Sequence, residues 1–363
     1  MKRRQFLTRS LASICATTLG WNMVQASSFE GFQMPDEAEP HERTFMQWPV
    51  NQTVYPDANF LTALQQTISV LANTIAEFEP VVMLMGNEHV TAARKKLGRR
   101  VEIWDIPTDD LWCRDAGPIF VKNNENELAV AHIKFNGWGG KQVHTNDGRV
   151  AEQVAKRLGV PLIDAGLVGE AGGVETDGDG TLLAHESSWV NENRNKLSRK
   201  QIEQRLLAAL GAEKIIWAPG IAGADITDYH IDALARFAKP GTVVIQLSEQ
   251  LDYNDPWSVA AFETFNLLGT AKDAKGRKIQ LVNLPEPQTT RVKSNDFVAS
   301  YVNYYVCNGA VISAQFGDRK ADAKAKTILK KLYPGRSVIQ LNVDPIGEVG
   351  GGIHCATQQQ PRV

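Results

Sequence analysis

Apolar residues at helical spacing alternate with short apolar runs along most of the chain. Between residues 57 and 78, one helical face carries Leu61, Leu64, Ile68, Leu71 and Ile75. The strand-like run VVMLM follows at 81–85. The same order recurs downstream: helices expected over 88–97, 151–159, 198–211, 258–269 and 321–333 precede strands expected over 101–106, 161–165, 214–218, 278–284 and 337–343. The pattern predicts an α/β protein built from repeated ββαβ-like modules in one large domain.

Turn and cap residues mark the ends of these elements. Ser198 and Gln201 have the spacing of a capping box, and Gly211 ends the same expected helix. The stretches NDG at 146–148 and DGDG at 177–180 carry the residue types of tight turns between strands. We therefore expect a hairpin at both places.

The first 26 residues have the layout of an export signal. Arg3 and Arg4 precede Phe6-Leu7, a weakly apolar run covers 11–24, and VQA at 24–26 has the small residues of a cleavage site. This segment resembles a twin-arginine signal, which implies an exported bacterial protein, periplasmic or secreted, with a mature chain of residues 27–363. An uncleaved amphipathic anchor or a chance basic terminus is the alternative, but the run is too short and too polar to span a bilayer.

Composition and charge narrow the class of function. With 43% hydrophobic and 22% charged residues, the chain is typical of a soluble globular protein. A net charge of -2 predicts neither nucleic-acid binding nor a polybasic membrane patch. Once the signal is removed, we expect no association with a membrane, and a homo-oligomer is compatible with these features. The partner must be inferred from the chemistry of the site.

The cysteines raise a question of chemistry. Removal of the signal removes Cys15 and leaves Cys113, Cys307 and Cys355, so at least one thiol stays unpaired in an oxidising compartment. Cys307 lies in an apolar strand-like run and reads as a core residue. Cys355 instead follows the glycine triplet of GGGIHC, where the backbone can hold a side chain exposed in a tight turn. A thiolate nucleophile would need a base or cation and a group to hold its electrophile.

Three polar clusters elsewhere offer such partners. DLWCRDAGP at 110–118 contains Trp112 and Asp115, although an Arg next to an Asp is often only a structural ion pair. The segment 170–194 places Glu170 and Glu175 near glycines that could serve turns alone.

The third cluster, DITDYHID at 225–232, crowds Asp225, Asp228, His230 and Asp232 together. In a strand, His230 and Asp232 would point to one face. Acidic residues around a histidine also suit a divalent cation, and aspartates suit the start of a helix. The chain's histidines show no HxH or HExxH pairing, which weighs against the metal site.

Taken together, these clusters resemble the agmatine deiminases and bacterial-type peptidylarginine deiminases of the guanidine-modifying superfamily. The resemblance runs from MPDEAEPHERTFMQWP at Met34 through WCRDAGP, FNGWGGK, DGDGTLLAHESSWVNENRN and FGDRKAD to GGGIHCATQQQP. It implies the pentein fold, a five-bladed α/β propeller of ββαβ modules with pseudo-fivefold symmetry.

By this resemblance, Asp115 and Asp232 would clamp the guanidinium of a small cationic substrate, since carboxylates match its planar fork of N–H donors. Cys355 would attack the guanidinium carbon, and His230 would act as acid and then as base through a thiouronium intermediate. No metal and no organic cofactor is implied.

Substrate contacts are implied for a second set of residues. Glu170 would be a further carboxylate on the substrate, with Glu175 as its alternative because Ala171 stands where the family's EGG element has glycine. Trp112 and Trp138 would cover the alkyl chain, although both could be core packing. Gly352 stands where many relatives have asparagine, next to the nucleophile.

We expect agmatine as the substrate, with N-carbamoylputrescine and ammonia as products. The alternative within the family is a peptidylarginine deiminase that acts on C-terminal arginine and gives citrulline. Two further classes are a metal-dependent hydrolase that uses the 225–232 cluster and a guanidine-binding envelope protein without turnover.

Overall fold

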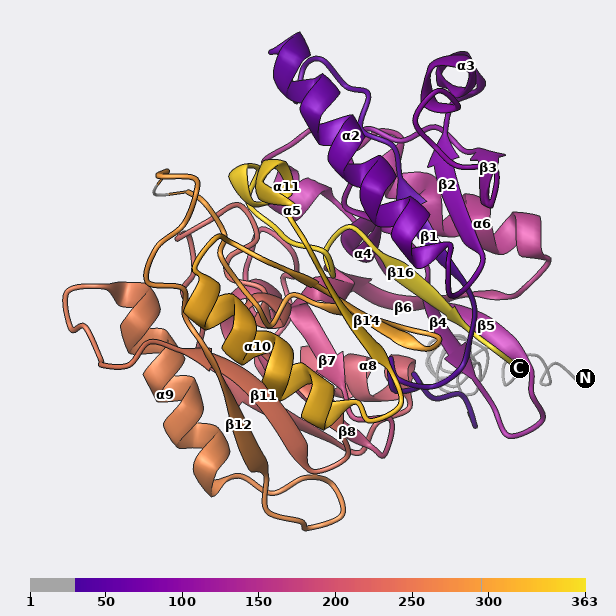
Figure 1. Ribbon diagram of the computed structural model, residues 1–363. Helices are drawn as coiled ribbons and strands as arrows, with labels where there is room; N and C mark the ends of the chain where they lie inside the picture. Colours follow the sequence, from indigo (N-terminus) through magenta and orange to yellow (C-terminus); the bar gives the residue numbers. More distant parts are fainter. Residues whose placement is uncertain (1–29, 295) are drawn as a thin grey trace, which may run out of the picture.

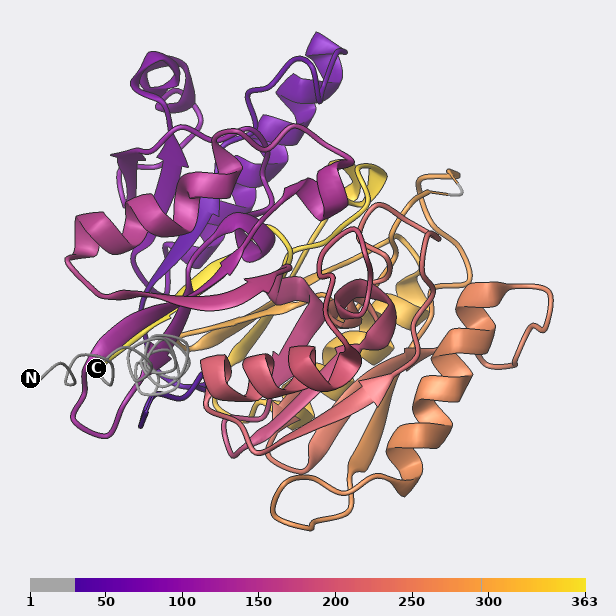
Figure 2. The same cartoon turned by 180° about the vertical axis from the view of Figure 1, so that it is seen from behind.

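The computed structural model describes residues 30–294 and 296–363, and the export signal expected at 1–26 lies outside this part. Within it, the strands form five small sheets arranged as the blades of an α/β propeller. Helices such as α2 (Ala58–Ile75) and α9 (Pro256–Thr270) lie on the outside of the sheets (Figures 1 and 2). The pentein fold that the resemblance implied is confirmed.

Four of the sheets repeat one unit: a first strand pairs antiparallel with a second, and a helical crossover leads to a third strand parallel to the second. The strands are β4 (Ile119–Lys122), β5 (Leu128–Lys134) and β6 (Leu162–Val168); β7 (Val174–Thr176), β8 (Thr181–His185) and β9 (Lys214–Ala218); β10 (Ala235–Lys239), β11 (Thr242–Leu247) and β12 (Gln280–Pro285); and β13 (Tyr305–Cys307), β14 (Ala310–Ala314) and β15 (Ser337–Leu341). The helices of the crossovers are α5 (Gly137–Gly140) and α6 (Val150–Leu158), then α7 (Glu186–Trp189) and α8 (Arg199–Leu210), then α9, and finally α10 (Arg319–Leu332).

The first blade joins the two ends of the chain. Strand β16 (Gln358–Pro361) pairs antiparallel with β1 (His41–Gln47), and β1 pairs parallel with β2 (Val81–Met85) across α2. This is the same repeated unit, completed by a strand from far along the chain. An extra strand, β3 (Val101–Asp105), follows the short helix α3 (Val90–Ala93) and pairs with β2. In Figure 1 the yellow β16 lies beside the indigo β1.

Local sequence explains where the longer helices begin and end. Asp57 caps α2 by accepting the N–H groups of Asn59 and Phe60, and the predicted face of α2 is buried. The capping box of Ser198 and Gln201 is present, and Gly211 ends α8 in the left-handed conformation at φ 63°. These predictions are confirmed.

Two local predictions were wrong. The NDG stretch at 146–148 is not a hairpin: it enters a short 3-10 turn, Asp147–Arg149, whose last residue leads directly into α6. The helix expected over 88–97 is only a 3-10 turn at Asn87–His89 followed by α3. The DGDG stretch at 177–180 does form the predicted hairpin, between β7 and β8.

Candidate active site

Cys355 lies in the turn that precedes β16, so the last strand brings it to the middle of the molecule. Its carbonyl accepts a hydrogen bond of 3.0 Å from the backbone N–H of Arg114, next to the start of α4 (Cys113–Ala116). The side-chain amide of Asn303 donates to Sγ at 3.2 Å. A Cβ at Gly352 would overlap the Asn303 side chain, which explains why a glycine stands there. The thiol is thus fixed by the neighbouring blades.

His230 faces two carboxylates. Its Nδ1 lies 3.6 Å from Oδ1 of Asp115, and its Nε2 lies 3.2 Å from Oε2 of Glu170. Contrary to the expectation from strand alternation, neither His230 nor Asp232 belongs to a strand. His230 instead precedes the 3-10 turn Ile231–Ala233, which leads into β10. The tight turn still directs both side chains towards the site.

Asp115 is oriented by two donors. The indole Nε1 of Trp138 donates to its Oδ2 at 3.0 Å, and the backbone N–H of Gly172 lies 3.3 Å from its Oδ1. A Cβ at Gly172 would stand 2.7 Å from Nδ1 of His230 and 2.8 Å from Oδ1 of Asp115. Only glycine therefore lets the backbone approach both side chains.

Asp232 has one oxygen engaged and one free. Its Oδ2 accepts a 2.7 Å hydrogen bond from Nδ1 of His354 and lies 3.6 Å from Sγ of Cys355. Among the described residues, no group hydrogen-bonds to the other oxygen, Oδ1, although the side chain is fully buried. A buried carboxylate oxygen without a partner is costly, so this atom calls for a donor from a ligand.

The side chains around the thiol shift one another's pKa values. Burial raises the pKa of the Cys355 thiol well above its ordinary value, and the charges of Asp232 and Asp115 raise it further. Burial alone would lower the pKa of His230, but Asp115 and Glu170 outweigh it and raise that pKa to about 9. Burial also raises the pKa of Asp115 to about 6. At neutral pH the site therefore holds a thiol, an imidazolium and ionised carboxylates.

Asp232 differs from Asp115 in the direction of its shift. Burial would raise the pKa of Asp232, but the hydrogen bond and the charge of His354 outweigh burial and lower it. Asp232 is thus ionised, with Oδ1 available. The ionised carboxylates of Asp115 and Asp232 beside the thiol favour the binding of a cation.

Glu170 and Glu175 play different parts. Glu170 contacts His230 and receives a 2.8 Å ion pair from Arg194, whereas Glu175 receives Arg236 at 2.9 Å and lies 3.8 Å from His354. Of the two candidates, Glu170 is the one beside His230.

The acidic stretch at 225–232 does not converge on one point. Asp225 accepts donors of its own turn, including the N–H groups of Thr227 and Tyr229. Asp228 binds Lys141 and Arg194, both at 2.8 Å. In residues 30–294 and 296–363, no group of three His, Cys, Asp or Glu side chains has the arrangement of a metal site. The cluster for which a metal site was an alternative thus separates into a turn, an ion pair and the two residues near Cys355.

The tryptophans are both buried. Trp138 donates to Asp115, and Trp112 packs against Gly351, where a Cβ would collide with its ring. Their contact with a substrate's alkyl chain stays a prediction. The thiol of Cys113 is fully buried with its pKa raised by that burial, so it is a core group beside the site.

Sequence reasoning missed Asn303, which contacts Sγ, the backbone N–H of His354 and the carbonyl of Asp232. No pattern marked it, since it stands alone before β13. It also missed His354, which adjoins Cys355 and could have been found from that adjacency.

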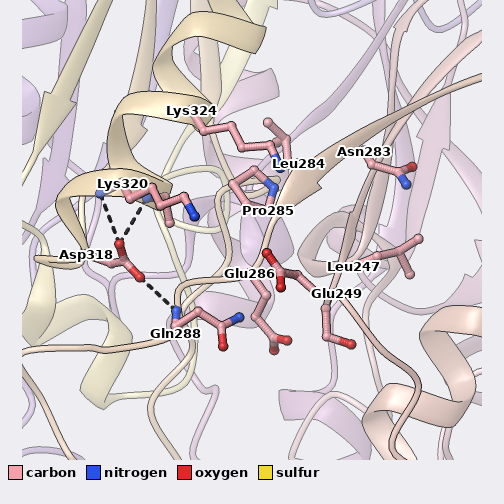
Figure 3. A pocket seen from close by; sticks show the side chains of 12 residues that line it. Leu247, Glu249, Asn283, Leu284, Pro285, Glu286, Gln288, Asp318, Lys320 and Lys324 are labelled. Carbon is pink, nitrogen blue, oxygen red and sulfur yellow. Dashed lines mark hydrogen bonds between the residues drawn. The ribbon is translucent and has the colours of Figure 1, made fainter.

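A cavity of about 260 Å³ opens away from this site, between α10 and the ends of β11 and β12 (Figure 3). Its Asp318 caps α10 and also accepts the N–H of Gln288, so this carboxylate is already satisfied. Neither Cys355 nor any of the neighbouring residues Asp115, Glu170, His230 and Asp232 lines this cavity.

A cysteine, a histidine and facing carboxylates at the centre of an α/β propeller define a hydrolase of the guanidine-modifying class. The Porphyromonas-type peptidyl-arginine deiminase family matches residues 33–361. The chain belongs to this family, and it is an enzyme that hydrolyses guanidino C–N bonds.

Similar proteins carry consistent names. A Streptomyces coelicolor protein named as a provisional agmatine deiminase is 37% identical, with 91% of this chain and 99% of that protein covered. The agmatine deiminase of Medicago truncatula is 33% identical, with 93% and 98% covered. The solved agmatine deiminase of Enterococcus faecalis superimposes with a TM-score of 0.85 at 29% identity, over 92% of this chain and 96% of that one.

Proposed function

We propose that the protein is an agmatine deiminase, which hydrolyses agmatine to N-carbamoylputrescine and ammonia. The observation that carries the proposal is the free, buried oxygen of Asp232 beside the Cys355 thiol. A guanidinium is always cationic and donates N–H groups in a plane, so it supplies the missing donor. The relatives from Medicago truncatula and Enterococcus faecalis, both named agmatine deiminases, favour agmatine among guanidines.

Binding places the substrate between carboxylates. Asp232 and Asp115 accept the guanidinium N–H groups from two sides, and Glu170 adds negative charge behind His230. The charge of the substrate then opposes the effect of Asp232 and Asp115 on the thiol. The pKa of Cys355 falls on binding, so the thiol loses its proton to water and the thiolate forms where an electrophile is already in place. The thiol regains a proton from water once the product has left.

The first chemical step forms a C–S bond. The Cys355 thiolate attacks the guanidinium carbon and gives a neutral tetrahedral adduct. His230, an imidazolium at neutral pH, gives its proton to the departing nitrogen. The C–N bond breaks, ammonia leaves, and a cationic thiouronium on Cys355 remains.

The second step reverses the roles. His230, now neutral, takes a proton from a water molecule that attacks the thiouronium carbon. The C–S bond breaks, the thiolate returns, and the ureido product leaves while ammonia takes up the remaining proton as ammonium. Atoms and charge balance as guanidinium plus water giving urea plus ammonium.

The test measures ammonia and ureido product from the purified protein with agmatine, free arginine and a C-terminal arginyl peptide in parallel. Turnover of agmatine above the others, absent in Cys355→Ala, is the expected result. Preference for the peptide would replace the proposal with a peptidylarginine deiminase. Binding of agmatine without turnover would make the protein a guanidine-binding protein.

We also propose that the protein is exported through the twin-arginine route, on the support of the sequence of residues 1–26 alone. Fractionation of a bacterial host with a twin-arginine pathway tests this. Replacement of Arg3 and Arg4 by Lys is expected to retain the protein in the cytoplasm, while an unchanged periplasmic level would refute the route.

A further inference from the structure

A chain of buried charged groups runs from the N-terminal segment to the nucleophile. Glu37 lies before β1 in the chain. Its Oε2 lies 2.9 Å from Nε2 of His354 and 3.0 Å from the guanidinium groups of both Arg114 and Arg236. Its Oε1 accepts the backbone N–H of Val306 at 2.9 Å. Both oxygens of Glu37 are therefore fixed by residues of other blades.

His354 bridges this carboxylate to the site. Its Nδ1 is 2.7 Å from Oδ2 of Asp232 and its Nε2 is 2.9 Å from Oε2 of Glu37. Burial opposes ionisation of both carboxyl groups, but Arg236 and His354 hold the pKa of Glu37 well below its usual range, and His354 holds that of Asp232 below. An ionised carboxylate only accepts hydrogen bonds. The imidazole ring of His354 therefore bridges the two carboxylates through its two nitrogens.

Little open space adjoins this network of charged groups. About 20 Å³ of open space remains beside Glu37, Arg114 and Arg236, which is room for about one water molecule. These charged groups thus contact one another, and Asp232 is the member of the network that lies beside the thiol.

The bridge has two effects on Asp232. It engages Oδ2, so that the carboxylate is held with Oδ1 free for a guanidinium N–H. It also places a hydrogen-bonding partner on the carboxylate oxygen that lies 3.6 Å from Sγ, which offsets part of the negative charge felt by the thiol.

We propose that Glu37 and His354 are positioning residues of the deimination, which act through Asp232 and do not touch the substrate. The proposal rests on the proposed function for its main assay. It adds two residues to the machinery, one of them from the segment directly before the first strand.

Two near-isosteric variants separate this role from simple packing. In His354→Asn the amide nitrogen falls near the place of Nδ1 and can still donate to Asp232, whereas in His354→Gln it falls near the place of Nε2 and can still donate to Glu37. A hydrogen bond to a charged group contributes enough that its loss lowers kcat/KM by about 10- to 100-fold. We expect that loss in His354→Gln and a clearly smaller loss in His354→Asn.

The opposite order, or equal losses in two variants that melt cooperatively, would mean that His354 supports the fold through Glu37, and it would overturn the proposal.

A second pair of variants covers the case in which both His354 variants fail to fold. Glu37→Gln and Glu175→Gln each remove one buried carboxylate from Arg236, at 3.0 and 2.9 Å, but only Glu37 also binds His354 within hydrogen-bond distance. We expect kcat/KM to fall about tenfold in Glu37→Gln and less than about threefold in Glu175→Gln. Equal falls would overturn the proposal.

Failure of the proposed function is distinguishable, because it appears as wild-type protein that does not turn over agmatine. The same variants are then compared on whichever guanidine is turned over. If none is, the rate of Cys355 alkylation by iodoacetamide at pH 8 decides. Without a donor on Oδ2, more of the negative charge of Asp232 acts on the thiol, so alkylation is expected to be at least about threefold slower in His354→Gln than in His354→Asn. Equal rates in the two variants would overturn the inference.

Discussion

We expect Asp232→Asn to make the Cys355 thiol more reactive towards alkylation and to lower kcat/KM for agmatine. The substitution keeps the shape of the side chain and an oxygen that can accept from His354, but it removes the negative charge 3.6 Å from Sγ. After burial, Asp232 is the largest cause of the raised pKa of Cys355, so the pKa of the thiol falls in the variant. Alkylation should therefore begin at lower pH than in the wild type.

Turnover should change in the other direction. Removing one partner of a buried charge pair costs about 3 kcal/mol at the low end of what is found in proteins. Because Asp115 and Glu170 still face the substrate, we take this lower figure, which corresponds to a loss of about 100-fold in kcat/KM for agmatine. Part of the loss should appear as a raised KM, since the guanidinium loses the free, charged acceptor Oδ1 of Asp232.

The assay pairs two readouts on one preparation: the pH dependence of iodoacetamide alkylation without substrate, and ureido-product formation with agmatine. Asp225→Asn is the matched control, because Asp225 lies in the same stretch and its oxygen only accepts donors of its own turn, which an asparagine also does. It should stay within about threefold of the wild type. An alkylation profile of Asp232→Asn that is unshifted or moves to higher pH would refute the electrostatic reasoning, and so would full turnover.

Four other outcomes are expected. Cys355→Ala should abolish product formation and still bind agmatine, and dialysis against EDTA should leave the wild-type rate unchanged; a chelator-sensitive rate would revive metal catalysis. The pKa of His230 is raised from 6.5 to about 9, so the protonated ring stabilises the fold fully below pH 6.5 and that contribution is lost as the pH rises through 9. The fall in Tm over this window should be shallower in His230→Asn, and an equal slope would contradict the assigned interactions. Gly172→Ala should lower kcat/KM about 10- to 100-fold, while Gly269→Ala in α9, where the nearest atom lies 4.0 Å from a new Cβ, should keep activity and raise stability by about 0.5–1 kcal/mol.

The elements and the chemistry of the site were readable from the sequence to different extents. Periodicity placed α2 and the other long helices because a buried face repeats every 3.6 residues, and caps such as Ser198 fixed their ends. The NDG stretch misled because the same residues that suit a hairpin also suit the entry to a helix, and only the pairing of distant strands decides between them.

The arrangement of the blades required more than periodicity. Nothing in the local pattern indicates that β16 pairs with β1, since strand pairing depends on contacts far apart in the chain. The blade order came from the resemblance to a family. For the same reason Asn303 and Glu37 were missed: each acts through partners far away in the sequence, and neither stands in a local motif of reactive groups.

The pairing of the first and last strands has a consequence for synthesis. Cys355 and β16 leave the ribosome long after β1, the strand with which β16 pairs. Until β16 has been made, the first blade lacks an edge strand and the site lacks the Cys355 thiol. Under the proposed mechanism, chains that stop before Cys355 are therefore inert towards guanidines.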